Sequence, residues 1–324
     1  MRKFIIALIL SLPHYLLNAQ QVDYSIVSVQ EESGIDFTQI TSASDYVCMP
    51  IVKRTNTSIN WLSNRILDIS KDGQKIAYLS YRNNSTNIFI KDISKQGSSI
   101  QRTNRSNILD FSYSPDGKYI CFSEKRGYEN QIFQTSADNG YVCRQITSGS
   151  LDFSPTYTSN MNLLFFARQE TRGASIWSYN VKNNFLSNYS NGMNPYPMPE
   201  EEAFLCVRTN SIGKSEIWKI NYKNGIEECI VSNPNRNFTS PVLSPNGLWI
   251  LFVGESILSG NEFTYHNTDL FACKIDGTSM IQLTYHAADD LSPVWSKDGK
   301  SIYFISQRGS TDGIANIWKM EFNY

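Results

Sequence analysis

Two histidines are the side chains best suited to metal binding. His266 and His286 are the only histidines outside the first nineteen residues, and Asp289 and Asp290 follow His286 closely. Imidazole and carboxylate groups together can hold a divalent transition metal. The spacing is irregular, however, and no Cys-x-x-Cys pair accompanies it. We therefore expect ordinary loop histidines and no cofactor, with a metal site of His266, His286 and Asp289 as the alternative.

The sequence also gives little support for a hydrolase. Gly254-Glu255-Ser256-Ile257-Leu258 begins like a Gly-x-Ser-x-Gly nucleophile turn but lacks the final glycine. No glycine-rich loop precedes a predicted helix, so a phosphate-binding loop is not predicted either. Binding is favoured over catalysis, and the question of an enzymatic activity stays open.

Polar residues recur where predicted strands begin, and several of them stand directly before a proline. The set comprises Asp110, Asp152, Ser154, Asn194, Ser240, Asp290 and Ser292. If these strands occupy equivalent places in a repeated fold, the polar groups form a ring in space. A ring with several carboxylates would bind a cation, a basic peptide loop or sugar hydroxyls. The alternative is a solvated channel whose polar residues cap the strand ends.

A repeat of roughly 44 residues must position these groups. Four turns share the pattern Ser-x-Asp/Asn-Gly, and an apolar strand follows each of them. The turns are Ser70-Lys71-Asp72-Gly73, Ser114-Pro115-Asp116-Gly117, Ser244-Pro245-Asn246-Gly247 and Ser296-Lys297-Asp298-Gly299. An apolar–aromatic pair follows each strand, and six such pairs end in Phe89, Phe133, Trp177, Trp218, Phe271 and Trp318. An insertion lies around residues 256–266.

The turn residues predict hairpins, because Asp-Gly and Asn-Gly tolerate the positive φ angles of a two-residue turn. Each unit then forms four short antiparallel strands. Such sheets bury both faces when six of them pack around an axis. The sequence therefore predicts an all-β, six-bladed β-propeller over residues 63–324, preceded by an extension over residues 20–62.

The sixth unit ends after its third strand. Near the N-terminus, Gln39-Ile40-Thr41 resembles Gln145-Ile146-Thr147 in the fourth strand of an earlier unit. An unpaired outer strand would expose backbone donors and acceptors. We therefore expect a strand at about residues 35–41 to pair with residues 317–322 and close the ring. The alternative is a loose leader.

The composition excludes some classes of protein. The chain has 324 residues, with 29 Lys and Arg against 30 Asp and Glu, and a net charge of −1. Nucleic-acid binding needs clustered basic residues and is not predicted. The 41% hydrophobic content is sufficient for a folded core.

The first nineteen residues have the pattern of a secretory signal peptide. Arg2 and Lys3 precede an apolar run over residues 4–12, and Ala19 is suited to cleavage. The apolar run is shorter than the ~20 residues that span a bilayer. We expect a periplasmic or secreted monomer without a transmembrane segment.

The cysteines are expected to be unpaired core residues. Cys121 and Cys143 fall on the second and fourth strands of one unit, and Cys206 and Cys229 repeat this relation. Two strand spacings of ~4.8 Å exceed the ~7 Å reach of a disulfide. Cys48 lies outside the repeat, and its pairing stays open.

Several motifs together resemble those of the TolB-like, WD-type propeller repeats. They are the Ser-Pro-Asp-Gly turn, the following Lys118-Tyr119-Ile120-Cys121-Phe122 and Lys300-Ser301-Ile302-Tyr303-Phe304, the Ser306-Gln307-Arg308 step and the Ile-Trp pairs. The resemblance covers about residues 63–324 and the closing strand. It implies an envelope protein that binds partners through a propeller face or the central channel.

The sequence thus predicts a non-catalytic interaction scaffold of the bacterial cell envelope, with a protein or peptide partner. One alternative is a metal-dependent carbohydrate-active enzyme of the propeller lyase type. Another is a glycan-binding module that uses exposed aromatics such as Tyr196 or Tyr265. Five arginines that recur after the second strand are expected to hydrogen-bond loop carbonyls between blades: Arg82, Arg126, Arg168, Arg208 and Arg308.

Overall fold

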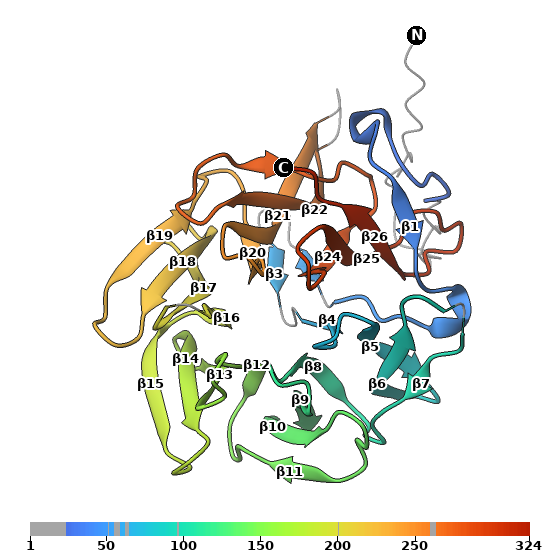
Figure 1. Ribbon diagram of the computed structural model, residues 1–324. Coiled ribbons are helices and arrows are strands. Elements are labelled where there is room, and N and C mark those ends of the chain that lie inside the picture. Colours follow the sequence, from blue (N-terminus) through green and yellow to red (C-terminus); the bar gives the residue numbers. More distant parts are fainter. Residues whose placement is uncertain are drawn as a thin grey trace, which may run out of the picture.

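Six four-stranded antiparallel sheets stand around a central axis in the computed structural model (Figure 1), which confirms the six-bladed β-propeller. The structure describes residues 24–50, 52–54, 59–61, 65–95, 97–199, 201–259 and 264–324. The predicted signal peptide and its cleavage site near Ala19 lie outside these residues. Within them, no helix is long and apolar enough to cross a membrane.

The first three blades follow each other along the chain. Blade 1 contains β4 (Leu67–Ile69), β5 (Lys75–Arg82), β6 (Ser85–Asp92) and β7 (Ile100–Gln101). Blade 2 contains β8 (Ile108–Tyr113), β9 (Tyr119–Arg126), β10 (Glu129–Ser136) and β11 (Cys143–Gln145). Blade 3 contains β12 (Asp152–Tyr157), β13 (Leu163–Glu170), β14 (Gly173–Asn180) and β15 (Leu186–Asn191).

The remaining blades complete the ring. Blade 4 contains β16 (Met193–Pro197), β17 (Ala203–Thr209), β18 (Ser215–Asn221) and β19 (Glu227–Val231). Blade 5 contains β20 (Phe238–Leu243), β21 (Trp249–Ser259), β22 (Thr264–Lys274) and β23 (Ile281–Gln282). Blade 6 contains β24 (Asp290–Trp295), β25 (Ser301–Ser306), β26 (Asn316–Glu321) and the N-terminal β1 (Phe37–Gln39).

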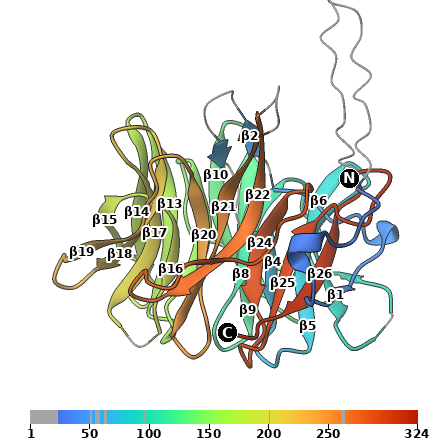
Figure 2. The same ribbon diagram turned by 90° about the horizontal axis from the view of Figure 1, so that it is seen from above.

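Four short elements lie outside this repeat. Two 3₁₀ turns, η1 (Gln30–Glu32) and η2 (Ala43–Asp45), belong to the N-terminal extension. The strands β2 (Val52–Arg54) and β3 (Ile59–Trp61) pair with each other alone. Figures 1 and 2 place this hairpin near the axis, at the end of the disc opposite the C-terminus. The insertion of blade 5 lengthens β21 and β22, which rise at the same end (Figure 2).

The second and third strands of each blade are the most apolar because they are covered on both faces. Ile120 and Phe122 in β9 are fully buried, and the Phe122 ring stacks on Phe133 of β10 with 5.6 Å between centroids. The predicted apolar strands and apolar–aromatic pairs therefore lie where the blades pack against each other.

The Ser-x-Asp/Asn-Gly turns differ from the prediction. In the first turn, the backbone N–H of Ser70 donates to the Lys75 oxygen at 2.9 Å, which leaves a loop of four residues. The Ser70 hydroxyl donates to the Asp72 carboxylate at 2.6 Å, and only Gly73 takes a positive φ, of 72°. The expected two-residue turn is wrong here, because the side-chain bond of Asp72 stabilises a longer loop.

A two-residue turn with two positive φ angles does occur at another hairpin. Asn83 and Asn84, with φ of 52° and 58°, join β5 to β6. Asparagine tolerates this conformation better than most residues. The hairpin lies at the other end of the blade from the Ser-x-Asp/Asn-Gly turn.

The N-terminal strand closes the ring as predicted. In the register of β1 with β26, Phe37 is opposite Met320 and Gln39 is opposite Trp318. The Thr41 hydroxyl accepts a hydrogen bond from the Ile317 N–H at 2.8 Å. In blade 2, Thr147 accepts from the Ile132 N–H at 3.0 Å in the same way. The Gln-Ile-Thr pattern thus marks a strand that caps the preceding one.

A buried ion cluster fastens the N-terminal extension to blade 6. The Arg308 guanidinium lies 2.6 Å from a carboxylate oxygen of Asp290 and 3.2 Å from one of Glu32. All three side chains are fully buried. Arg308 also lies over the Phe37 ring, 4.2 Å from its centroid. The extension therefore belongs to the folded structure of this blade.

All six cysteines are unpaired. Cys121, Cys206 and Cys273 are fully buried, as expected for core residues. Cys229 is exposed and Cys143 is half-buried, so the interpretation as core residues is wrong for these two. Cys48 packs against the core, and burial raises the pKa of its thiol to about 11.

Candidate functional site

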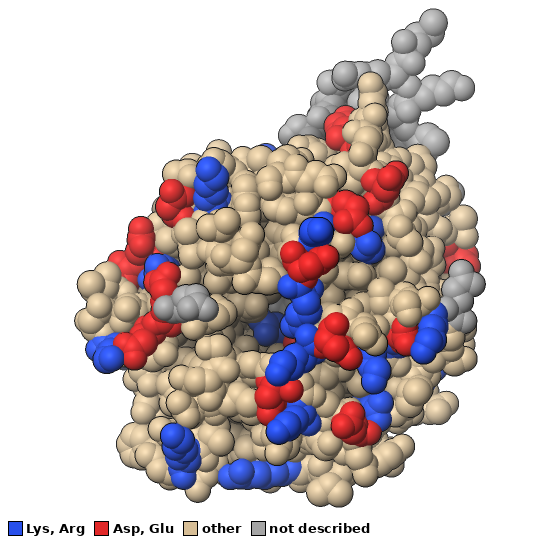
Figure 3. Space-filling view, in the orientation of Figure 1, with Lys and Arg blue, Asp and Glu red and all other residues tan. Residues whose placement is uncertain are grey.

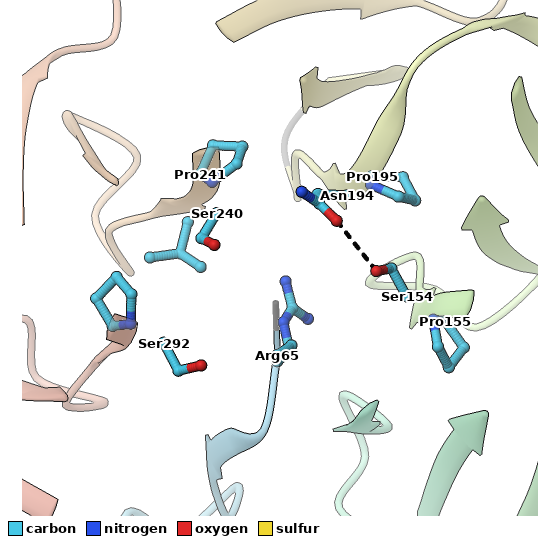
Figure 4. A pocket seen from close by; sticks show the side chains of 10 residues that line it. Arg65, Ser154, Pro155, Asn194, Pro195, Ser240, Pro241 and Ser292 are labelled. Atoms are coloured by element: carbon cyan, nitrogen blue, oxygen red, sulfur yellow. Dashed lines mark hydrogen bonds between the residues drawn. The ribbon is translucent and has the colours of Figure 1, made fainter. Parts of the chain in front are cut away.

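A pocket on the propeller axis gathers polar residues from the innermost strands (Figure 4). It is lined by Arg65, Ser154, Pro155, Asn194, Pro195, Ser240, Pro241, Val242, Ser292 and Pro293. Four of the predicted ring residues, Ser154, Asn194, Ser240 and Ser292, thus lie together although they come from four different blades.

A bulge in each inner strand aims these four side chains. In blades 3, 4, 5 and 6 the register between the first and second strands shifts around the Ser-Pro or Asn-Pro pair. The four residues have left-handed φ angles of 54°, 55°, 54° and 50°, in chain order. The following proline donates no backbone hydrogen bond, which the inner edge of a blade tolerates. The bulge turns each polar side chain toward the axis.

Left-handed backbone at a non-glycine residue costs on the order of 1–3 kcal/mol, and such strain concentrates at functional sites. Side-chain bonds stabilise the bulges. The Ser154 hydroxyl donates to the Asn194 side-chain oxygen at 3.1 Å, and the Asn194 amide donates to Thr239 at 3.1 Å. Neighbouring blades are thereby linked at the pocket wall.

Asp110 occupies the corresponding position of blade 2 but does not line the pocket. One of its carboxylate oxygens accepts from the Ser123 hydroxyl, and the other accepts from the Ser154 N–H at 2.9 Å. Burial raises the pKa of Asp110 to about 6. This carboxylate therefore holds the bulge of blade 3 in place.

Asp152 and Asp290 also lie away from the pocket. Two nitrogens of Arg168 donate to Asp152, at 2.7 and 3.1 Å, and Arg308 binds Asp290. Both residues precede the bulge by two positions, and each is bound there by an arginine of its own blade. The expected ring of carboxylates is not formed, because no described residue that lines the pocket is an acid.

Arg65 is the pocket residue that the sequence analysis missed. Its guanidinium points to the centre of the ring (Figure 4) and lies over the Tyr196 ring, 4.9 Å from the centroid. One terminal nitrogen donates to the Thr156 hydroxyl at 3.3 Å. Among the described residues, no carboxylate pairs with Arg65. When the blades are aligned on their turns, Ile66 takes the place of the ring residue in blade 1. Arg65 stands directly before it in the chain, so this alignment would have placed Arg65 beside the ring.

Tyr196 was expected to be an exposed aromatic. It is half-buried beneath the Arg65 guanidinium instead, so a sugar cannot stack on the face that the guanidinium covers. The side chain of Tyr265 lies outside the described residues. The glycan-binding alternative therefore draws no support from Tyr196.

Of the two histidines, only His286 has a described side chain, and both of its ring nitrogens are hydrogen-bonded within the protein. Nδ1 of His286 accepts from the Ala288 N–H at 2.9 Å, and Nε2 donates to the Ile26 oxygen at 2.6 Å. Burial and the nearby Arg308 lower the pKa of His286. Asp289 accepts from the backbone and hydroxyl of Thr268. The side chain of His266 lies outside the described residues, and those described contain no cluster of metal ligands.

Four of the recurring arginines lie over the aromatic residue of the third strand. The distances to the ring centroid are 4.1 Å for Arg82, 4.6 Å for Arg126, 4.6 Å for Arg168 and 5.0 Å for Arg208. Arg82 and Arg208 also donate to backbone oxygens, as expected. The most consistent partners are rings and carboxylates, which the sequence analysis did not predict.

The Ser-x-Asp/Asn-Gly turns surround one end of the channel; we call this end the turn face. A Cβ placed on Gly73 would lie 3.4 Å from the Lys297 side chain, and one on Gly117 would lie 2.9 Å from Lys71. The turns of blades 6 and 1 thus pack on the turn glycine of the following blade. Figure 3 shows this face hollowed at its centre, with basic and acidic side chains beside the hollow.

Comparison with known proteins agrees with this architecture. A family model described as PD40, TolB beta propeller domain, matches residues 67–261. The chain belongs to this TolB β-propeller family. A structure assigned to TolB from Agrobacterium tumefaciens has a TM-score of 0.62 at 14% identity, covering 80% of this chain and 90% of that one.

Propellers with other names share the fold. Oligogalacturonate lyase from Vibrio parahaemolyticus has a TM-score of 0.59 at 10% identity, covering 90% of this chain and 94% of that one. A Tricorn protease homolog from Saccharolobus solfataricus is 25% identical over 174 residues, which is 51% of this chain. The aligned part spans only 15% of that relative's length. TolB-family membership thus establishes the propeller but does not choose between binding and catalysis.

Proposed function

We propose that this protein is a non-catalytic binding propeller of the cell envelope that engages a protein partner at the turn face. The observation that carries the proposal is the polar pocket on the axis, where four strained residues from separate blades face one guanidinium. The TolB family and the signal-peptide pattern support an envelope location. The turns of blades 5, 6, 1 and 2 pack on each other at the turn face, which favours a rigid rim on that side.

The rim carries exposed charges of both signs. Lys71 and Asp72 come from blade 1, and Lys297 and Asp298 come from blade 6. Mixed charge of this kind favours a specific protein surface over a polyanion, since alternating signs reward a complementary pattern. The lyase alternative is weaker, because both ring nitrogens of His286 are already hydrogen-bonded.

Site-specific photo-crosslinking in the native envelope tests this proposal. A photoreactive amino acid at exposed Lys71 is expected to trap a discrete partner. The matched control is exposed Asn188 on the outer strand β15, at the periphery of the ring and away from the central hollow (Figure 1). Equal adducts from both positions, or adducts from Asn188 alone, would contradict binding at the turn face.

A further inference from the structure

Arg65 supplies a positive charge that no acid among the described residues lining the pocket neutralises, although it acts through space on the buried Asp110, whose pKa is raised by burial and lowered in part by this guanidinium. Among the described residues it forms one hydrogen bond, to Thr156, and one ring contact, with Tyr196. The nearby acid Asp68 accepts from the backbone N–H groups of Ile69 and Tyr113, at 2.8 and 2.9 Å. Neither Asp68 nor Asp110 forms an ion pair with the guanidinium, and neither lines the pocket.

The Arg65 guanidinium packs with one face on an aromatic ring, so N–H groups along its edge can donate hydrogen bonds to a ligand. Tyr196 covers one face, while the Phe111 N–H donates to the Arg65 backbone oxygen at 3.0 Å and anchors the main chain. The Ser240 side chain lies across the pocket, and Figure 4 shows it on the wall that faces Arg65. A planar fork of donors beside a hydroxyl matches the two oxygens of a carboxylate.

We propose that the axial pocket binds a carboxylate group, supplied by an acidic side chain of the protein partner that enters from the turn face. One guanidinium suits a singly charged, planar anion better than a phosphate, which usually attracts several basic groups. Figure 3 shows basic side-chain atoms inside the hollow of the turn face. Among the described lining residues, Arg65 is the only Lys or Arg.

This inference rests on the proposed function, since it takes the ligand from a protein partner. The carboxylate chemistry is shared with uronic sugars, so the experiment must separate the two sources. The probes are N-acetyl-aspartic acid amide and its neutral counterpart N-acetyl-asparagine amide, with galacturonic acid and galactose as the sugar pair. Calorimetric titration or the Arg side-chain NMR signals would report binding.

The aspartyl probe is expected to bind saturably, and the asparaginyl probe at least about tenfold more weakly, as for loss of one charge-assisted bond. Arg65→Gln should abolish the preference, and Arg65→Lys should retain part of it. The matched control Arg126→Gln, at an exposed arginine of blade 2, should leave it unchanged. Thermal unfolding of each variant checks that the propeller is folded.

Equal binding of both peptide probes, no saturable binding of the aspartyl probe, or a preference that survives Arg65→Gln would overturn the proposal. Clearly tighter binding of galacturonic acid than of the aspartyl probe would refute a protein partner as the source of the carboxylate. The titration needs no partner. A negative titration with a positive Lys71 crosslink therefore removes this inference alone, whereas a failed crosslink removes the proposed function.

Discussion

Blades 3 to 6 and blades 1 to 2 build the wall of the channel differently. In blades 3 to 6 the inner strand has a left-handed Ser or Asn followed by proline. Blade 1 has Ile66 at this position, with Arg65 beside it, and blade 2 has Asp110 followed by Phe111. The four regular blades thus contribute uncharged polar side chains at this position. The two blades that depart from the pattern contribute the charged residues Arg65 and Asp110.

The two irregular blades divide their charges between separate tasks. The Asp110 carboxylate is buried in the protein interior and supports the bulge of blade 3 by accepting a hydrogen bond from the Ser154 N–H. Arg65 faces the pocket and has no acidic partner among the described residues. One charge therefore serves the structure, and the other is available to a ligand.

The largest expected effect concerns blade 6, which shares the bulge but depends on the N-terminal extension. Arg308→Ala leaves Glu32 and Asp290 buried without their partner and should lower the free energy of unfolding by about 3–5 kcal/mol. Arg126→Ala, at an arginine with a 45% exposed side chain, should cost at most about 1 kcal/mol. Urea unfolding compares them, and equal losses would refute a special role for the closing cluster.

The bulges of blades 3 to 6 should show a specific order of substitutions. Ser240→Val places a β-branched side chain at φ of 54° and should destabilise the fold by about 1–3 kcal/mol. Ser240→Gly relieves the strain and should cost much less. In blade 2, Asp110→Gly should be the costly change, because it removes two buried hydrogen bonds. Urea unfolding of the three variants measures these losses of stability. Equal losses for Ser240→Gly and Asp110→Gly would contradict the difference between the two groups of blades.

Asp110 should make stability depend on pH. Its folded pKa of about 6 exceeds the ordinary value of 3.8, so the folded state binds the proton more tightly. The resulting stabilisation is present below pH 3.8 and is lost as the pH rises through about 6. Asp110→Asn should remove this contribution, of about 3 kcal/mol. Unfolding of both proteins from pH 4 to 7 measures it, and a constant difference would contradict the assignment.

His286 should give a smaller effect of opposite sign. Its pKa is lowered from 6.5, so the unfolded state binds the proton more tightly. Its contribution is therefore present above pH 6.5 and is lost as the pH falls below that value. The hydrogen-exchange protection factor of Gly309, whose N–H donates to the Ile26 oxygen, should fall on acidification. Exchange that shows the same pH response in His286→Gln would exclude this histidine as the cause.

The sequence was sufficient to predict the fold because the signals are local and repeated. Turn residues, apolar strands and the Gln39-Ile40-Thr41 copy each depend on neighbouring residues in the chain. The direction of a side chain at a bulge depends on the register shift between two strands, which the sequence does not show. That is why Asp152 was expected in the ring.

The position of Arg65 was missed for a related reason. The inner strand of blade 1 is short and lacks the proline, so the repeat pattern does not extend to it. The Arg65 side chain crosses the axis toward Tyr196 in blade 4. Such a contact between blades far apart in sequence becomes visible only when the ring is closed in space.

The most direct test of the binding site is a crystal structure grown with N-acetyl-aspartic acid amide. The account predicts the probe's carboxylate at the Arg65 guanidinium, with N···O distances of about 2.7–2.9 Å, and the Ser240 hydroxyl close by. A probe bound elsewhere with the pocket empty, or Arg65 turned onto an acid of its own chain, would contradict it.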